Sequence, residues 1–198
     1  MSARLLRIAR EALAKRAGAA EQEGAEAGFT LIELMVVLLI MAILLAIAIP
    51  TFLGVKGGAQ DRAAQSNLSN ALISAKSIYA TNSSYLVATS MATTLNAQEP
   101  ELVFATGTAV TTNTNSISVN VGSGGGQLVL VDYSSANGGS CWAVSDWDGT
   151  NAATEIGGTT FPGQGTTYSG WKIPAGGCSA AAIPTTATFG SKYPAAVS

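Results

Sequence analysis

The feature that most constrains this chain is an apolar run near its N-terminus, "FTLIELMVVLLIMAILLAIAI", from Phe29 to Ile49. As an α-helix these 21 residues would extend about 31 Å, which is enough to cross the hydrocarbon core of a membrane. From Leu34 to Ile49 no side chain is polar. Glu33 is the one charged residue in the run. A carboxylate at membrane depth costs about 2.5–3.5 kcal/mol on insertion scales, so Glu33 needs a function and a partner.

The cations on either side of the run predict its orientation. Lys56 and Arg62 follow the run, whereas five cations precede it: Arg4, Arg7, Arg10, Lys15 and Arg16. An excess of Lys and Arg marks the cytoplasmic side of a membrane segment. We therefore expect the N-terminus in the cytoplasm and all residues after the run on the outer side.

Three interpretations of the run compete. It is a secretory signal peptide cut at Ala46-Ile47-Ala48, a permanent membrane anchor, or a segment whose leader is removed before the apolar residues, at Gly28. The polar residues Thr30 and Glu33 inside the lead-in, and Pro50 just behind the A-x-A site, argue against the signal peptide.

The third interpretation accounts for Glu33. No Lys or Arg lies between Arg16 and Lys56, but cleavage after Gly28 would create an α-ammonium group on Phe29. That cation would stand four residues from Glu33, a spacing at which opposite charges attract within one helix, and an acid in the first turn also complements the helix dipole. The same two groups could neutralise each other between neighbouring subunits.

These residues resemble the class III signal of type IV prepilins and pseudopilins: Gly28-Phe29-Thr30-Leu31-Ile32-Glu33, followed by the apolar run and Pro50. The resemblance implies that a membrane prepilin peptidase cuts after Gly28 and methylates the amino group of Phe29. It implies that Glu33 aligns incoming subunits. It also implies self-association into a helical filament, drawn from the membrane by a pilus assembly platform and its ATPase.

The segment after the run should be a glycine-interrupted and then amphipathic helix, residues 51–82. Three glycines follow Pro50 and make continuous helix costly, and the resemblance implies a helix bend formed by Pro50, Gly54, Gly57 and Gly58. Further on, apolar residues recur at i, i+3 and i+4, which predicts a buried helical stripe. The stripe consists of Ala64, Leu68, Ala71, Leu72, Ala75 and Tyr79, and the helix should end near residues 81–85.

Residues 83–198 should form a β-rich head. Alternation predicts strands at 116–121, 127–133, 141–147 and 166–173, the first two joined by the glycine-rich loop 122–126. The resemblance implies an α+β, pilin-like fold in which the long N-terminal helix packs on a small antiparallel β-sheet. Residues 179–198 hold two prolines and no clear period, which predicts an irregular surface tail.

Cys141 and Cys178 are the only cysteines, and both should lie on the outer side. An even pair in an oxidising compartment favours a disulfide, with two free buried thiols as the alternative. The disulfide would stabilise the head by about 3–4 kcal/mol in the chain-entropy model.

The composition excludes several classes of chemistry. The chain has no His, so Ser-His-Asp and Cys-His catalysis and Cys-His zinc sites are impossible. A net charge of −2 gives no electrostatic case for nucleic acid. We predict a protein that is not an enzyme and has no cofactor.

Two further patterns are compatible with ligand binding, but each has a simpler interpretation. Asp146, Asp148, Gly149 and Glu155 match positions 3, 5, 6 and 12 of a calcium loop, but Val144 occupies the first ligand position, so tight metal binding is not expected. Three tryptophans could stack on sugars, but in a small sheet they should be core residues: Trp142, Trp147 and Trp171.

The sequence thus predicts a leader at 1–28, an apolar membrane and filament-core helix at 29–50, the helix at 51–82 and the head at 83–198. The expected function is a structural subunit of an extracellular pilus, or fimbrium, of the kind used in adhesion and motility. One alternative is a pseudopilin of a type II secretion or DNA-uptake machine. An alternative of another class is a membrane-anchored, exported glycan-binding domain.

Overall fold

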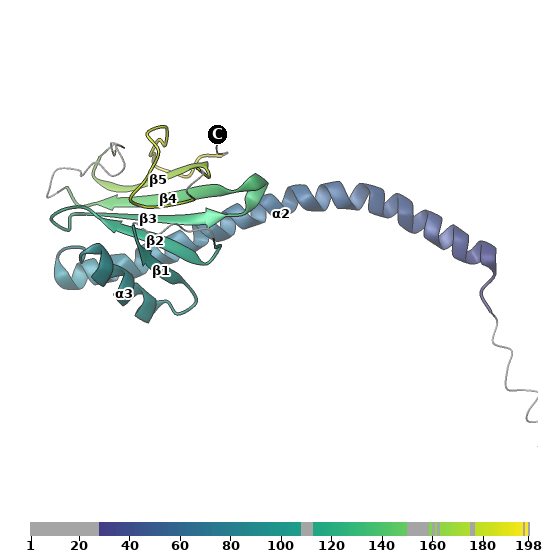
Figure 1. Ribbon diagram of the computed structural model, residues 1–198, viewed down its shortest axis with the longest axis horizontal. Helices are drawn as coiled ribbons and strands as arrows, with labels where there is room; N and C mark the ends of the chain where they lie inside the picture. Colours follow the sequence, from purple (N-terminus) through teal and green to yellow (C-terminus); the bar gives the residue numbers. More distant parts are fainter. Residues whose placement is uncertain are drawn as a thin grey trace, which may run out of the picture. The chain divides into compact units, whose positions relative to one another are not determined.

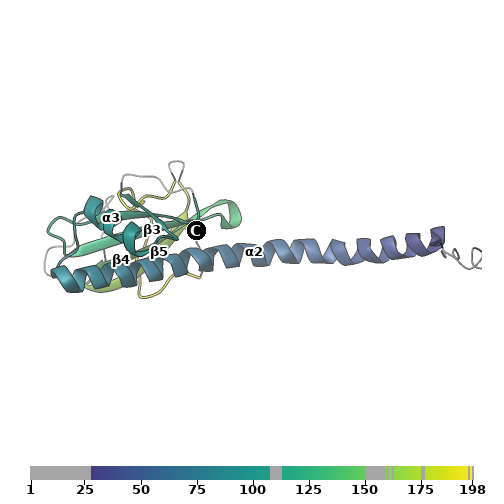
Figure 2. The ribbon, with the colours of Figure 1, turned by 90° about the horizontal axis from the view of Figure 1, so that it is seen from below.

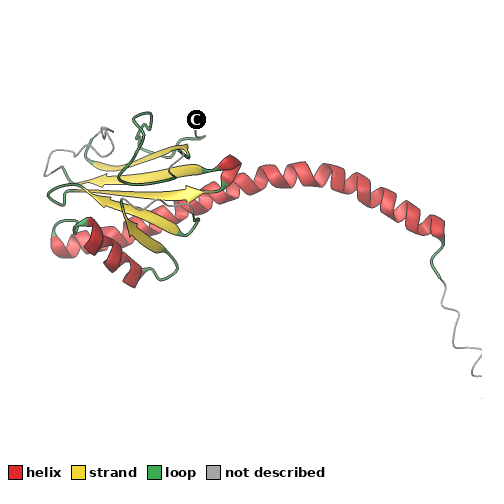
Figure 3. Ribbon diagram, viewed as in Figure 1, coloured by secondary structure: helices red, strands yellow, loops and turns green. Residues whose placement is uncertain are grey.

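The computed structural model describes residues 28–107, 113–149, 159, 161, 163–174, 177–195 and 197. The chain divides into two units, Met1–Ile49 and Pro50–Ser198. Helices and a single sheet build the described part of the chain, which is the α+β layout expected for a pilin-like fold (Figures 1 and 3). Its elements are α2 (Leu31–Asn82), α3 (Ala88–Gln98), β1 (Val103–Thr106), β2 (Ser116–Val121), β3 (Gln127–Ser134), η1 (Ala136–Gly138), β4 (Ser140–Trp147) and β5 (Gly165–Lys172).

Helix α2 continues without a break through Pro50 and the glycines that follow it. This corrects the expectation of a glycine interruption after residue 50. A glycine costs about 1 kcal/mol and a proline about 3 kcal/mol relative to alanine inside a helix. Interrupting the helix in its middle, however, would forfeit hydrogen bonds on both sides of the break and require a second, unfavourable nucleation. The helix therefore continues through these residues. A bend at these four residues remains a prediction.

The second half of α2 buries the stripe that the sequence predicts. Ala64, Leu68, Ala71, Leu72 and Ala75 are all 8% exposed or less. Tyr79 is partly buried, and the neighbouring Ile78, which the prediction omitted, is 5% exposed. The helix ends at Asn82, where the expected end lies. The next residue, Ser83, has a left-handed backbone conformation with a φ of 56°.

Helix α3 was not predicted from the sequence, because residues 86–198 were interpreted as strands and turns. It buries Met91, Ala92 and Leu95 in the core that contains the stripe of α2. Thr and Ser occupy much of its length, and β-branched Thr is more typical of strands, so composition hides a three-turn helix here.

The sheet has the order β1-β2-β3-β4-β5. The pairs β2–β3, β3–β4 and β4–β5 are antiparallel, as expected, and these four strands fall within one residue of the predicted ranges. Strand β1 was missed, and it pairs with β2 in parallel, so the sheet is mixed rather than purely antiparallel. Strand β1 has only four residues, too few for alternation to be recognised.

The two faces of the sheet have different covers. Side chains at alternate positions of β2, β3 and β4 pack against α2 and α3, and Figure 2 shows α2 along one side of the strands. The intervening side chains, among them Val129, Val131 and Ala143, pack against the C-terminal segment. That segment is irregular, as predicted, but it is not a surface tail: Ala180, Ile183 and others are buried. It is buried because the second apolar face of a sheet also needs a covering layer.

Candidate functional site

The start of α2 holds the predicted processing residues. A Cβ atom added to Gly28 would meet nothing within 4 Å, and Phe29 is 83% exposed. Thr30 caps the helix: its Oγ1 accepts the backbone N–H of Glu33 over 3.2 Å, and its carbonyl accepts the N–H of Leu34 over 3.2 Å. This cap was not predicted from the sequence, although the Thr-x-x-Glu spacing of a capping box was its signal.

Glu33 is the acidic residue in the first turn of α2. An acid in that position complements the positive end of the helix dipole. The residues from Gly28 to Val55 include no Lys or Arg, so this stretch offers Glu33 no side-chain cation. The roles of Gly28 as cleavage site, Phe29 as methylated residue and Glu33 as assembly residue remain predictions.

The first half of α2 is apolar on every side, and no other described residue covers its large side chains. Each large hydrophobic side chain from Phe29 to Val55 is between 48% and 83% exposed. By length and composition alone, α2 is able to cross a membrane. Soluble monomers rarely expose more than a few hundred Å² of contiguous apolar surface, so this surface marks an interaction with lipid or with protein.

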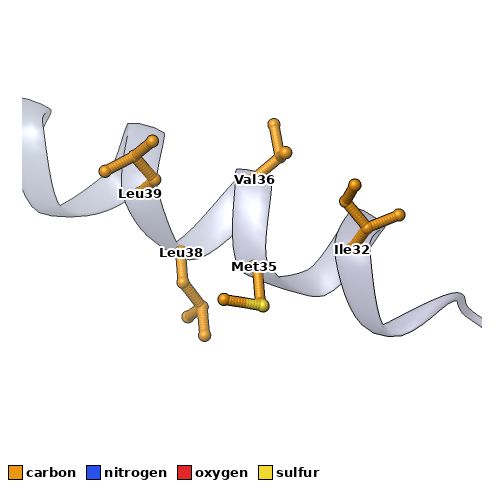
Figure 4. A pocket seen from close by; sticks show the side chains of 5 residues that line it. All are labelled: Ile32, Met35, Val36, Leu38 and Leu39. Atoms are coloured by element: carbon orange, nitrogen blue, oxygen red, sulfur yellow. The ribbon is translucent and has the colours of Figure 1, made fainter.

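The hollow along this surface does not suit a small ligand. It is lined by Ile32, Met35, Val36, Leu38 and Leu39, all from one stretch of one helix. Figure 4 shows these side chains projecting from the helix without an opposing wall. Small-molecule sites are concave and enclose most of their ligand, whereas a bare helix flank suits another helix or lipid tails.

The carboxylates of the proposed calcium loop have protein partners. Asp146 accepts hydrogen bonds from Tyr85 and Thr166, each over 2.5 Å, and forms an ion pair with Lys76 over 2.9 Å. Burial opposes ionisation of Asp146, but these donors outweigh it and hold the pKa of its carboxyl below the usual value. Asp148 accepts the hydroxyl of Tyr79 over 2.7 Å.

Glu155 lies outside the described residues. Within them, no group of three His, Cys, Asp or Glu side chains is arranged to hold a metal ion. Weak or absent calcium binding, argued from Val144, remains a prediction.

Two of the three tryptophans are core residues, as predicted. Trp142 is 2% exposed and Trp171 is 4% exposed. The indole N–H of Trp142 donates to Asp61 on α2 over 2.9 Å. Trp147, at the end of β4, is half-buried. Because Trp142 and Trp171 are covered, the three do not form an exposed platform for stacking sugars.

Cys141 and Cys178 form the expected disulfide. Both are 0% exposed. Cys141 lies on β4, and Cys178 lies in the C-terminal segment that covers the second face of the sheet. The disulfide therefore holds that covering segment on the sheet.

A buried carboxylate, Asp132 on β3, was missed in the sequence. It is 0% exposed, and burial raises the pKa of its carboxyl to about 7. Alternation along "QLVLVDY" was the signal, because Asp132 falls on the same strand face as Leu128 and Leu130.

The comparisons with known proteins concern the N-terminal segment. Residues 24–49 match the family model of the prokaryotic N-terminal methylation motif. A search of curated proteins and a search of solved structures each gave no match. The matched segment contains Gly28, Phe29 and Glu33. The chain therefore carries, at residues 24–49, the class III signal peptide of type IV pilins and pseudopilins.

Proposed function

We propose that this protein is the structural subunit of a type IV pilus-like extracellular filament. Before cleavage, residues 1–28 lie on the cytoplasmic side of the membrane. Prepilin peptidase cuts after Gly28, Phe29 becomes the methylated N-terminus, and the mature subunit stays in the cytoplasmic membrane with Phe29 at the cytoplasmic face. An assembly platform and its ATPase then move it into the filament. The observation that carries the proposal is the apolar half of α2, which is uncovered on every side and lies directly behind the methylation motif.

The occupant of that surface changes during assembly. Lipid tails cover the apolar half of α2 before assembly, and the same helix halves of other subunits cover it in the filament. A polar group is tolerated in such a core only when it is paired. The α-ammonium of Phe29 in one subunit and the carboxylate of Glu33 in its neighbour supply that pair. This contact joins two different surfaces, and such a contact repeats as an open helix when the rotation between subunits does not close a ring.

The division of the chain follows from this assignment. Residues 29–50 form the membrane segment and filament core. Residues 51–82 join the core to the head, and residues 83–198 form the coat of the filament. The motif belongs to structural proteins rather than to enzymes, and self-association requires no cofactor.

A pseudopilin of a secretion or DNA-uptake machine is the second candidate, because it carries the same motif. The glycan-binding anchor is disfavoured by the burial of Trp142 and Trp171. Pili used in adhesion or motility are long and can be sheared from the cell, whereas a pseudopilin is expected to stay with its machine.

The proposal is tested on protein made in its native host. Mass spectrometry should find a mature N-terminus at Phe29 that carries a methyl group, and sheared surface filaments should contain this chain as their main subunit. A mature N-terminus at Met1 would contradict processing. A methylated Phe29 in a chain that stays with the cells would favour the pseudopilin.

A further inference from the structure

Asp132 is a carboxylate inside the helix–sheet interface of the head. Its register partners are Ile117 on β2 and Trp142 on β4, and both are buried. Asp132 itself is 0% exposed, and it follows Leu128 and Leu130 on the strand face that packs against α2. An ionised carboxylate in such a place destabilises the fold unless other groups compensate its charge.

Within the described residues, two hydrogen bonds reach this carboxylate, and neither donor is charged. Asn67 on α2 donates its Nδ2 to Oδ2 over 3.2 Å, and the backbone N–H of Tyr133 donates to Oδ1 over 2.7 Å. In the described part of the chain, no Lys or Arg forms an ion pair with Asp132. Asp146, on strand β4 of the same sheet, differs from Asp132 because it forms an ion pair with Lys76.

The titratable groups around Asp132 supply no positive charge. From α2, Asp61 accepts the indole N–H of Trp142. From the C-terminal segment, Tyr193 packs edge-on against Trp142, with ring centroids 5.6 Å apart, and Tyr168 of β5 packs against Tyr193. Burial, and the charges of Tyr168 and Asp132, raise the pKa of Tyr193, so its hydroxyl stays neutral.

The hydroxyl of Tyr193 is buried and has no hydrogen-bond partner in the described structure. Arg62, the cation of α2 that lies closest in sequence to Asn67, is exposed and makes no ion pair within the described residues. The surroundings of Asp132 therefore favour its neutral form over its ionised form.

We propose that Asp132 is a pH-responsive contact between α2 and the sheet: α2 packs most firmly when this carboxyl is protonated, and the packing loosens when it ionises. The inference is independent of the function proposed above. Burial raises the pKa of Asp132 from 3.8 to about 7, so the folded chain binds this proton more tightly than the unfolded chain. The resulting stabilisation is complete below pH 3.8 and is lost as the pH rises through about 7.

Thermal unfolding of the full chain in detergent micelles, followed by tryptophan fluorescence, tests this at pH 5 and pH 8. Wild type should melt higher at pH 5 by roughly 5 °C. Asp132→Asn, which has the same shape without a charge, should lose most of that difference because its melting temperature rises at pH 8. The matched control is Asp146→Asn, which removes a paired carboxylate and should melt lower at pH 8 while keeping the pH dependence.

An Asp132→Asn variant that keeps the wild-type pH dependence would overturn the inference. If this variant does not fold, a carbon-13 NMR titration of the wild-type carboxyl groups gives the answer directly. A midpoint for Asp132 near 7 supports the pH-responsive contact, and a midpoint near 4 rules it out.

Discussion

At Gly125 the backbone leaves no room for a side chain. Its φ is +72°, and a Cβ atom there would lie 2.6 Å from the carbonyl oxygen of Tyr85. The Tyr85 N–H donates to the Gly125 carbonyl over 2.7 Å. The glycine-rich loop between β2 and β3 is thus held against the segment that follows α2. Glycine is required at this position for two separate reasons, its backbone conformation and the close approach of another chain segment.

Gly125→Ala should therefore destabilise the head by about 2–4 kcal/mol, the combined cost of a left-handed alanine and of overpacking. The matched control is Gly138→Ala, where φ is +87° but a Cβ atom would meet nothing within 4 Å. That change should cost only about 1–2 kcal/mol. Chemical denaturation of both variants in the same detergent measures the difference. Equal losses would show that the contact with Tyr85 is not what requires glycine.

At the scale of elements, the sequence predicted those helices and strands whose apolar residues recur with a clear period. The segments "SISVNV" and "QLVLVDY" alternate clearly and are joined by a glycine loop, so their hairpin was found with bounds correct to within one residue. The helical stripe from Ala64 to Tyr79 was found because its apolar residues recur at i, i+3 and i+4. Helix α3 and β1 were not found, because one is rich in Ser and Thr and the other is very short.

The N-terminal site could be predicted from the sequence, whereas the environment of Asp132 could not. The motif at Gly28, Phe29 and Glu33 is a local pattern of residues and needs no tertiary structure to be seen. Asp132 could not be assigned in this way. Its environment comes from Asn67 on α2 and Trp142 on β4, far apart in sequence. Which strand face meets α2 follows from the tertiary fold.

Strand β1 lies at the edge of the sheet, and a side chain occupies its outer hydrogen-bonding groups. Asn96 on α3 donates to the carbonyl of Phe104 over 2.9 Å and accepts the Phe104 N–H over 2.8 Å. Unpaired edge groups invite association with another strand, and native sheets block them in several ways. Here an amide side chain takes the place of a neighbouring strand.

Asn96→Ala should expose that edge and make the Phe104 amide hydrogen exchange much faster than in wild type. We expect a loss of about 1–3 kcal/mol in the stability of the head, because a donor and an acceptor lose their partners. Thr93→Ala, on the exposed surface of the same helix, is the control and should leave Phe104 protected. Unchanged exchange at Phe104 in the Asn96 variant would show that water or another group satisfies the edge.

At the scale of the whole molecule, polar and apolar surfaces are divided along the chain. The head buries its apolar side chains on both faces of one sheet, whereas residues 29–55 bury none of theirs. A chain built in this way has a stable head and a helix that must find cover elsewhere. Lipid and copies of the same helix are the two covers that the proposed function provides in turn.

Glu33 should be needed for assembly but not for insertion or cleavage. Glu33→Ala removes a charge from the membrane segment, so insertion should be at least as good as in wild type. The Thr30 cap uses the backbone N–H of residue 33 and survives the change. In the filament, however, the α-ammonium of Phe29 would lose its counter-charge, and an unpaired buried charge costs about 3–5 kcal/mol at every subunit.

We therefore expect Glu33→Ala cells to hold mature-length subunit in the membrane and to lack surface filaments. Glu33→Gln should fail in the same way, because it restores shape without charge. The control is Glu101→Ala, which removes a carboxylate from the head and should leave assembly intact. Each variant is expressed as the only copy, and immunoblots of membranes are compared with sheared surface material. Normal filaments from Glu33→Ala alone would mean that the carboxylate does not pair with Phe29, and the charge in this helix would need another physical explanation.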